Sequence, residues 1–125
     1  MSRPGPPILI GGTGEKRTLP LVARHADACN VFDIPDGGGT VRHKLAILEA
    51  ECAAIGRPYA EIDKTISTRF DPAEPTEEFV ERCRRLEELG IGHVVCITKG
   101  PWTAESVERL AAAVPVLEAE SAPTR

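Results

Sequence analysis

The segment whose residues most clearly suggest ligand binding is a glycine-rich stretch near the start of the 125-residue chain. It reads Gly11-Gly12-Thr13-Gly14-Glu15-Lys16-Arg17 and joins a short apolar run, residues 7–10, to a pattern with helical spacing. Glycines between a strand and a helix let the backbone bend and approach a ligand closely. Backbone amides at such a bend, together with a helix N-terminus, bind anions. The stretch therefore predicts either a phosphate cradle or a flexible turn, and its spacing fits neither a P-loop nor the dinucleotide-binding glycine pattern.

The cysteines and histidines, which could ligate a metal or take part in catalysis, are scattered along the chain. The two cysteines closest in sequence, Cys83 and Cys96, are 13 positions apart, and the histidines are equally dispersed. Zinc sites need clustered ligands, so we expect no metal site and reduced, partly buried thiols. His25 and His43 fit structural roles at a helix end and on a basic helical turn. Lys99 and Trp102 predict either the wall of an anion pocket or a packed surface turn.

Composition narrows the class of protein. Apolar residues make up 42% of the chain and charged residues 27%, which is typical of a globular domain. The net charge of -4 and the lack of a basic patch argue against nucleic-acid binding. No apolar run approaches the length of a membrane span, and residues 1–5 do not resemble a signal peptide. We therefore expect a cytoplasmic protein that binds neither nucleic acid nor membrane.

The elements that must position the glycine-rich stretch follow a regular alternation. Apolar or β-branched runs predict strands at residues 7–10, 28–32, 64–70 and 92–97. Amphipathic patterns between and after them predict four helices, capped by Thr76 and Thr103 in the last two cases and stopped by Gly56 and Gly90 after the middle two. Residues 1–117 thus form one α/β domain of four βα units with a parallel sheet, and residues 118–125 form a frayed tail.

The predicted inward-facing residues of three helices complete this pattern. They are Leu19, Val22, Ala23 and Ala26 in the first helix; Val41, Leu45, Leu48, Cys52 and Ile55 in the second; and Val107, Leu110, Ala111 and Val114 in the last. Two architectures fit four such units: a small doubly wound sheet, or half of a TIM (β/α)8 barrel, since a whole barrel needs about 250 residues. A half-barrel would have two open strand edges and an uncovered apolar face.

Two motifs resemble the luciferase-like monooxygenase superfamily, and within it the coenzyme F-420-dependent oxidoreductases. Residues 6–19 read Pro-Pro-Ile-Leu-Ile-Gly-Gly-Thr-Gly-Glu-Lys-Arg-Thr-Leu, and residues 21–30 read Leu-Val-Ala-Arg-His-Ala-Asp-Ala-Cys-Asn. Weaker similarity continues through residues 41–45, 62–65 and 90–93. The family fold is a TIM barrel, and this chain resembles its C-terminal half, the fifth to eighth strands.

The resemblance implies a cofactor site. Gly11, Gly12 and Gly14 would present amides to the phosphate of coenzyme F-420 or, alternatively, FMN, with Thr13, Glu15 and Lys16 at the border. The resemblance also places Cys29 and Asn30 at the cofactor pocket, although the residues around Cys29 favour the simpler role of a core thiol. Pro20 departs from the family pattern and predicts that the helix starts no earlier than Lys16 or Arg17.

The sequence therefore leaves two functions open. The first is a fragment or subunit of a flavin- or deazaflavin-dependent oxidoreductase, which contributes the phosphate loop for hydride transfer or monooxygenation of a small molecule. Its partner would be the N-terminal half-barrel or a second copy, because the groups that hold the ring system and act on substrate belong to the family's first four strands. No catalytic residue is predicted here. The second is a catalytically inactive half-barrel that self-associates.

Overall fold

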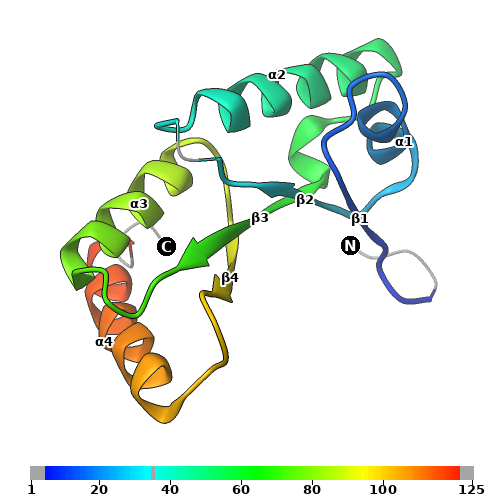
Figure 1. Ribbon diagram of the computed structural model, residues 1–125. Helices are drawn as coiled ribbons and strands as arrows, with labels where there is room; N and C mark the ends of the chain where they lie inside the picture. Colours follow the sequence, from blue (N-terminus) through cyan, green and yellow to red (C-terminus); the bar gives the residue numbers. More distant parts are fainter. Residues whose placement is uncertain (1–4, 35, 122–125) are drawn as a thin grey trace.

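A computed structural model describes residues 5–34 and 36–121 of the chain (Figure 1). Residues 1–4, which include most of the segment used to exclude a signal peptide, lie outside this description, as do Pro35 and residues 122–125 of the predicted tail. The elements are β1 (Leu9–Gly11), α1 (Thr18–His25), β2 (Ala28–Phe32), α2 (Gly39–Ala54), a short 3-10 turn (Tyr59–Glu61), β3 (Asp63–Phe70), α3 (Thr76–Glu88), β4 (His93–Thr98) and α4 (Ala104–Ser121). The prediction of four βα units is confirmed.

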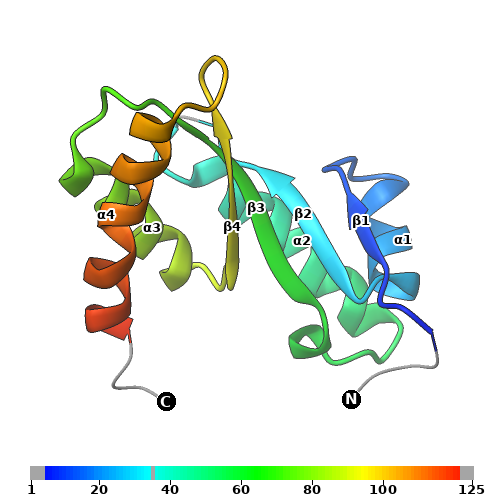
Figure 2. The same ribbon diagram turned by 90° about the horizontal axis from the view of Figure 1, so that it is seen from below.

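The four strands form one parallel sheet in the order β1-β2-β3-β4. Each strand therefore pairs with the strand of the next βα unit, as Figure 2 shows. A doubly wound sheet reverses its strand order at a switch point and carries helices on both faces. The sequential order excludes that alternative for this sheet and is compatible with a segment of a barrel.

All four helices cover the same face of the sheet. Ile10 is paired with Cys29, and Val31 with Ile66, which in turn is paired with Val94. Paired residues of adjacent strands point to the same side, and these residues all pack in the helix-side core. Figure 1 shows the helices following one another along this side, while the other side of the sheet carries none.

The core consists of three successive clusters between sheet and helices. The first contains Leu19, Val22, Ala23, Ala26, Cys29, Leu48, Cys52 and Ile62; the second contains Val31, Val41, Leu45, Ile66, Leu86 and Ile91; the third contains Phe70, Phe79, Val80, Cys83 and Ala113. The predicted inward-facing residues of α1 are thus confirmed. Those of α2 are confirmed except for Ile55, which follows the last helical residue and is 47% exposed.

The face without helices exposes large apolar side chains. Leu9, Phe32, Val95 and Ile97 are between 40% and 58% exposed, and each alternates with a residue that packs in the helix-side core. Alternation is a consequence of the strand pleat, which directs successive side chains to opposite faces. The open-face residues of the intervening strand β3, Asp63, Thr65, Ser67 and Arg69, are polar or charged, so the apolar side chains lie on both sides of a polar strand. Exposed apolar side chains gathered on one face favour an interface.

The helix ends agree with most of the predicted signals. Gly56 and Gly90 have φ values of +74° and +101°, as helix-terminating glycines do. Thr103 caps α4: its Oγ1 accepts from the amide of Ser106, whose Oγ accepts from the amide of Thr103. The cap predicted at Thr76 is wrong, because Thr76 is the first helical residue and Pro75 occupies the cap position without a side-chain hydrogen bond.

The structure corrects two expectations for α4. Its inward-facing residues are Ser106, Leu110, Ala113 and Leu117 rather than the predicted set, of which only Leu110 packs against the core. Val107 and Val114 are 51% and 47% exposed. The helix also continues to Ser121, so residues 118–121 are not part of a frayed tail. Among the described helices, none has both the length and the apolar character needed to cross a membrane.

Candidate functional site

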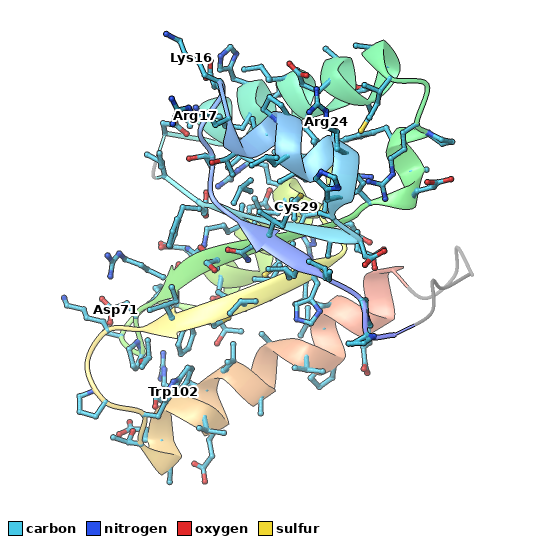
Figure 3. All side chains as sticks on the ribbon, turned by 90° about the vertical axis from the view of Figure 1, so that its right-hand side faces the viewer. Lys16, Arg17, Arg24, Cys29, Asp71 and Trp102 are labelled. Atoms are coloured by element: carbon cyan, nitrogen blue, oxygen red, sulfur yellow. The ribbon has the colours of Figure 1, made fainter. Side chains whose placement is uncertain are left out.

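The glycine-rich stretch forms the connection from β1 to α1. The carboxyl ends of parallel strands lie at one edge of a sheet, which is where α/β proteins place their sites. Gly11 is paired with Asn30 of β2, and the amide of Gly12 donates to the carbonyl oxygen of Asn30 at 3.0 Å. The loop that follows, residues 12–17, is thereby anchored beside the end of β2. Figure 3 shows Lys16 and Arg17 at its tip.

The backbone of this loop leaves its later amides available. Because the amide of Gly12 is bonded within the sheet, it cannot serve a ligand, which corrects one part of the expected role of the three glycines. The amide of Leu19 donates to the carbonyl oxygen of Gly14 at 2.8 Å and closes the first turn of α1. Within the described part of the chain, no acceptor satisfies the backbone amides of residues 13–18. Of these donors only the Thr18 amide belongs to α1, because the Leu19 amide is bonded to Gly14 and Pro20 has no N–H, so an anion here would be bound mainly by amides of the loop.

The two later glycines permit a close approach to Thr18. A Cβ atom at Gly12 would lie 3.1 Å from Thr18 Cγ2, and one at Gly14 would lie 3.0 Å from Thr18 Oγ1. Gly12 also has a φ of +127°, a conformation that side-chain-bearing residues rarely adopt. The loop therefore wraps around the Thr18 side chain, and glycine at both positions is explained by space and, at Gly12, by backbone conformation.

The charges around the loop come from two βα units. Glu15 Oε2 accepts from Lys44 Nζ at 2.8 Å and lies 3.4 Å from His43 Nε2, both on α2. The hydrogen bond from Lys44 is the main reason that the pKa of Glu15 lies below its usual value. Since Glu15 is engaged by α2, the exposed side chains of Lys16 and Arg17 remain for an anion. Sequence analysis treated His43 as part of a solvated turn and missed this contact, which depends on tertiary packing.

A second glycine-rich connection gives an instructive contrast. The chain reaches α2 through Gly37, Gly38 and Gly39, and there the carboxylate of Asp36 accepts from the amides of Gly38 and Thr40 at 3.1 Å and 3.0 Å. An acidic side chain of the protein itself thus occupies the N-terminus of α2. The cap positions themselves, Gly38 at α2 and Arg17 at α1, form no side-chain cap bond, so the difference is that no described carboxylate accepts from the amides of residues 13–18. Of the two glycine-rich connections, only the one before α1 keeps its amides for a ligand.

The Asp36 cap predicts an acid-sensitive contribution to stability. Hydrogen bonds from Thr40 hold the pKa of Asp36 below its usual value in the folded protein. The cap therefore stabilises the fold at pH values above the unfolded pKa of about 3.9 and loses its effect as the pH falls through the lower, folded pKa. We expect Asp36→Ala to lower the urea midpoint at pH 7 and the gap to the unmodified chain to close below about pH 4. A gap of constant size from pH 7 to pH 3 would contradict this assignment.

The two predicted pocket residues of β2 point to opposite faces. Cys29 is 0% exposed and lies between the sheet and α1 (Figure 3), and burial raises the pKa of its thiol. It is a core residue, as the simpler interpretation predicted, and does not line the open face. Asn30 does lie on the open face, where its amide nitrogen donates to Thr65 Oγ1 at 2.9 Å and its Oδ1 accepts from Ser67 Oγ at 3.1 Å. These two β3 hydroxyls fix Asn30 beside the loop, and no local sequence pattern indicates either contact.

The connection after β4 is a packed surface turn. Trp102 stacks on Phe70 with ring centroids 6.3 Å apart and an interplanar angle of 15°. Lys99 is highly exposed, and its Nζ lies 3.9 Å from Asp71 Oδ2. Figure 3 places Asp71 and Trp102 far from Lys16 and Arg17, so this turn is not part of the glycine-loop site.

A partly buried charge cluster supports the carboxyl edge of the sheet and was not found from sequence. Arg82 of α3 bonds both carboxylate oxygens of Glu74, donates to the carbonyl oxygen of Arg69 at 2.9 Å, and lies 3.9 Å from Asp33. Thr68 Oγ1 donates to the same Asp33 at 2.9 Å. Glu74 and Arg82 are only eight positions apart, but Asp33 is 35 positions from Thr68, and its place in the cluster depends on the pairing of β2 with β3.

Two hollows flank the sheet without including the glycine loop. The first has a volume of about 620 Å³ and lies on the sheet face without helices, near the amino ends of the strands. It is lined by Leu9, Ala28, Asp63, Thr65, His93 and six further residues. The other, of about 650 Å³, lies beside the Arg82 cluster. In the described part of the chain no group of three or more His, Cys, Asp or Glu side chains is arranged to hold a metal ion.

Comparison with known proteins adds no assignment. No protein-family model matches the sequence, and no curated protein matches it either.

Proposed function

We propose that this chain is half of a luciferase-like (β/α)8 barrel and that it supplies the phosphate-binding loop for coenzyme F-420 or, alternatively, FMN. The observation that carries the proposal is the β1–α1 loop, whose amides at residues 13–18 have no acceptor within the described chain and whose helix has no side-chain cap. The sequential parallel sheet with helices on one face supports the barrel part of the proposal.

The loop residues fit a phosphate in three respects. The amides of residues 13–17 and the Thr18 amide of α1 would donate to its oxygens, and the helix dipole favours its negative charge. Gly14 has no side chain that could block a phosphate from the loop amides. A Cβ atom at this position would also lie only 3.0 Å from Thr18 Oγ1. Lys16 and Arg17 are exposed beside these amides and add positive charge, while Lys44 neutralises Glu15. Asn30 borders the loop on the open face.

The bound cofactor would supply hydride transfer or monooxygenation chemistry toward a small-molecule substrate. The role of this chain is to bind and orient the cofactor through its phosphate. We propose no catalytic residue in it, and we propose that the remaining barrel strands come from an N-terminal half-barrel or from a second copy. A cytoplasmic location fits a protein that uses a soluble cofactor.

Titration of the purified chain tests the proposal directly. FMN and coenzyme F-420 are added separately to the chain alone and to the chain mixed with the N-terminal half of a luciferase-like barrel, and bound cofactor is followed by fluorescence. We expect saturable binding in at least one of these conditions and competition by inorganic phosphate. Riboflavin, which lacks the phosphate, is the matched control and should bind at least tenfold more weakly. Absence of binding in all conditions would refute the proposal.

The alternative function is a half-barrel without catalytic activity that self-associates. The exposed apolar residues Phe32, Val95 and Ile97 on the open sheet face favour it. A stable assembly that binds neither FMN nor coenzyme F-420 would support this alternative over the first proposal.

A further inference from the structure

We propose that two copies of this chain close one barrel, with β4 of each copy beside β1 of the other and the free flank of α4 as a central contact. The free flank is defined by Val107, Ala111 and Val114. The inference deepens the half-barrel part of the proposed function by naming the partner, and it does not depend on cofactor binding.

The free flank of α4 is the side turned away from α3. Ser106, Leu110, Ala113 and Leu117 face the core, and Arg109 lies toward α3, since its Nη2 donates to the carbonyl oxygen of Glu74 just before that helix. At about 100° per residue, Val107 is displaced about 160° around the helix from Arg109. Val107, Ala111 and Val114 share this side at helical spacing and are all exposed. An apolar helix flank of this kind is expected where another helix packs.

The sheet edges of two copies are compatible in direction. The edge strands are β1 and β4, and all strands run parallel. Rotating one copy by half a turn about the barrel axis therefore places β4 parallel to β1 of the other at both junctions. Two sets of four βα units give the eight that close a barrel. The same rotation places the free flank of α4 beside α1 of the partner.

The charges at these two edges are complementary. The α1 edge carries Lys16, Arg17 and Arg24, and α1 contains no acidic residue. On α4, by contrast, the one described basic residue, Arg109, is turned toward α3, while Glu118 lies on the free flank, about 20° around the helix from Val107, and Glu108 lies next to that flank. Opposite charges on edges that meet favour the intended pairing, whereas like edges would repel each other. This complementarity favours a second copy as the occupant.

Closure would also cover the open face. Leu9, Phe32, Val95 and Ile97 point to the side without helices and would lie in the barrel interior. Burial of these four apolar side chains favours closure by about 25 cal/mol for each square ångström of apolar surface removed from water. The polar and charged side chains of β3 on the same face, Asp63, Thr65, Ser67 and Arg69, would lie in the interior beside them.

Adjacent alanines on α4 give a matched test of the free flank. Ala111 and Ala112 are both exposed, but Ala112 is turned about 100° further around the helix, toward solvent. Sedimentation of the cofactor-free full chain is expected to show twice the 13.4 kDa of one chain. We expect Ala111→Glu to raise the dimer dissociation constant at least tenfold and Ala112→Glu to leave it within about twofold, because only the first buries a charge at the contact.

Each sedimentation result either supports or contradicts a barrel closed by two copies. Circular dichroism of both variants checks that the helical fold persists, and the surface position of both residues makes its loss unexpected. A dimer weakened selectively by Ala111→Glu supports the barrel closed by two copies. A monomer at tens of micromolar, a larger assembly, or a dimer affected equally by both substitutions would overturn it. These measurements contain no cofactor, so the absence of a dimer would contradict the two-copy barrel alone. The FMN and coenzyme F-420 titrations test cofactor binding separately.

Discussion

Replacing Gly12 by alanine is expected to weaken FMN or coenzyme F-420 binding at least tenfold. Its φ of +127° is strained for any residue with a Cβ atom, and that atom would lie 3.1 Å from Thr18 Cγ2. Strain of this kind costs about 1–3 kcal/mol. The loop can relieve it by breaking the Gly12 to Asn30 hydrogen bond, which would move the amides of residues 13–18 away from their present positions.

The measurement is a cofactor titration combined with urea unfolding. Gly92→Ala is the matched control, because Gly92 has no positive φ and no atom within 4 Å of its Cβ position. Gly14→Ala distinguishes steric crowding from backbone strain, because Gly14 has no positive φ and its Cβ would lie 3.0 Å from Thr18 Oγ1. Adding Thr18→Ala should therefore restore cofactor binding to Gly14→Ala. It should not restore binding to Gly12→Ala, whose backbone strain remains. If Gly12→Ala binds cofactor like the unmodified chain, the loop does not form the phosphate site.

The strand and helix order was predictable because each βα unit carries its signals locally. Residues 28–32 were placed within their observed strand, and the stripe from Val41 to Cys52 was placed on the buried side of α2. These signals depend on side-chain period and on terminating glycines, which act over one helix or strand. Strand order is not local, and only the structure separates the sequential sheet from a doubly wound one.

The sequence predicts the wrong buried face where two sides of a helix carry similar apolar patterns and only the packing partner decides between them. In α4 the set Val107, Ala111 and Val114 has the same spacing as the buried set, and the contact with the third core cluster selects the other side of the helix. At the candidate site, the glycines and Lys16 lie in one short segment and can be proposed from sequence, whereas the contacts of Glu15 with α2 and of Asn30 with β3 join residues about 30 to 40 positions apart. Local patterns contain no information on such pairs.

The largest loss of stability is expected from Arg82→Met in the charge cluster at the carboxyl edge. The side chains of Arg82, Glu74 and Asp33 are 19%, 13% and 12% exposed. Removing the guanidinium leaves two mostly buried carboxylates near each other and also frees the carbonyl oxygen of Arg69. Breaking a fully buried pair costs about 3–5 kcal/mol, and partial exposure reduces the expected loss to about 2–3 kcal/mol.

Arg84→Met is the matched control on the same helix, since Arg84 pairs with Glu81 at 3.3 Å where both are more exposed. Exposed pairs of this kind contribute about 0–1 kcal/mol. Urea unfolding at pH 7 should therefore separate the two variants by at least about 1 kcal/mol. Equal stabilities of the two variants at pH 7 would show that the cluster contributes no more than a surface ion pair.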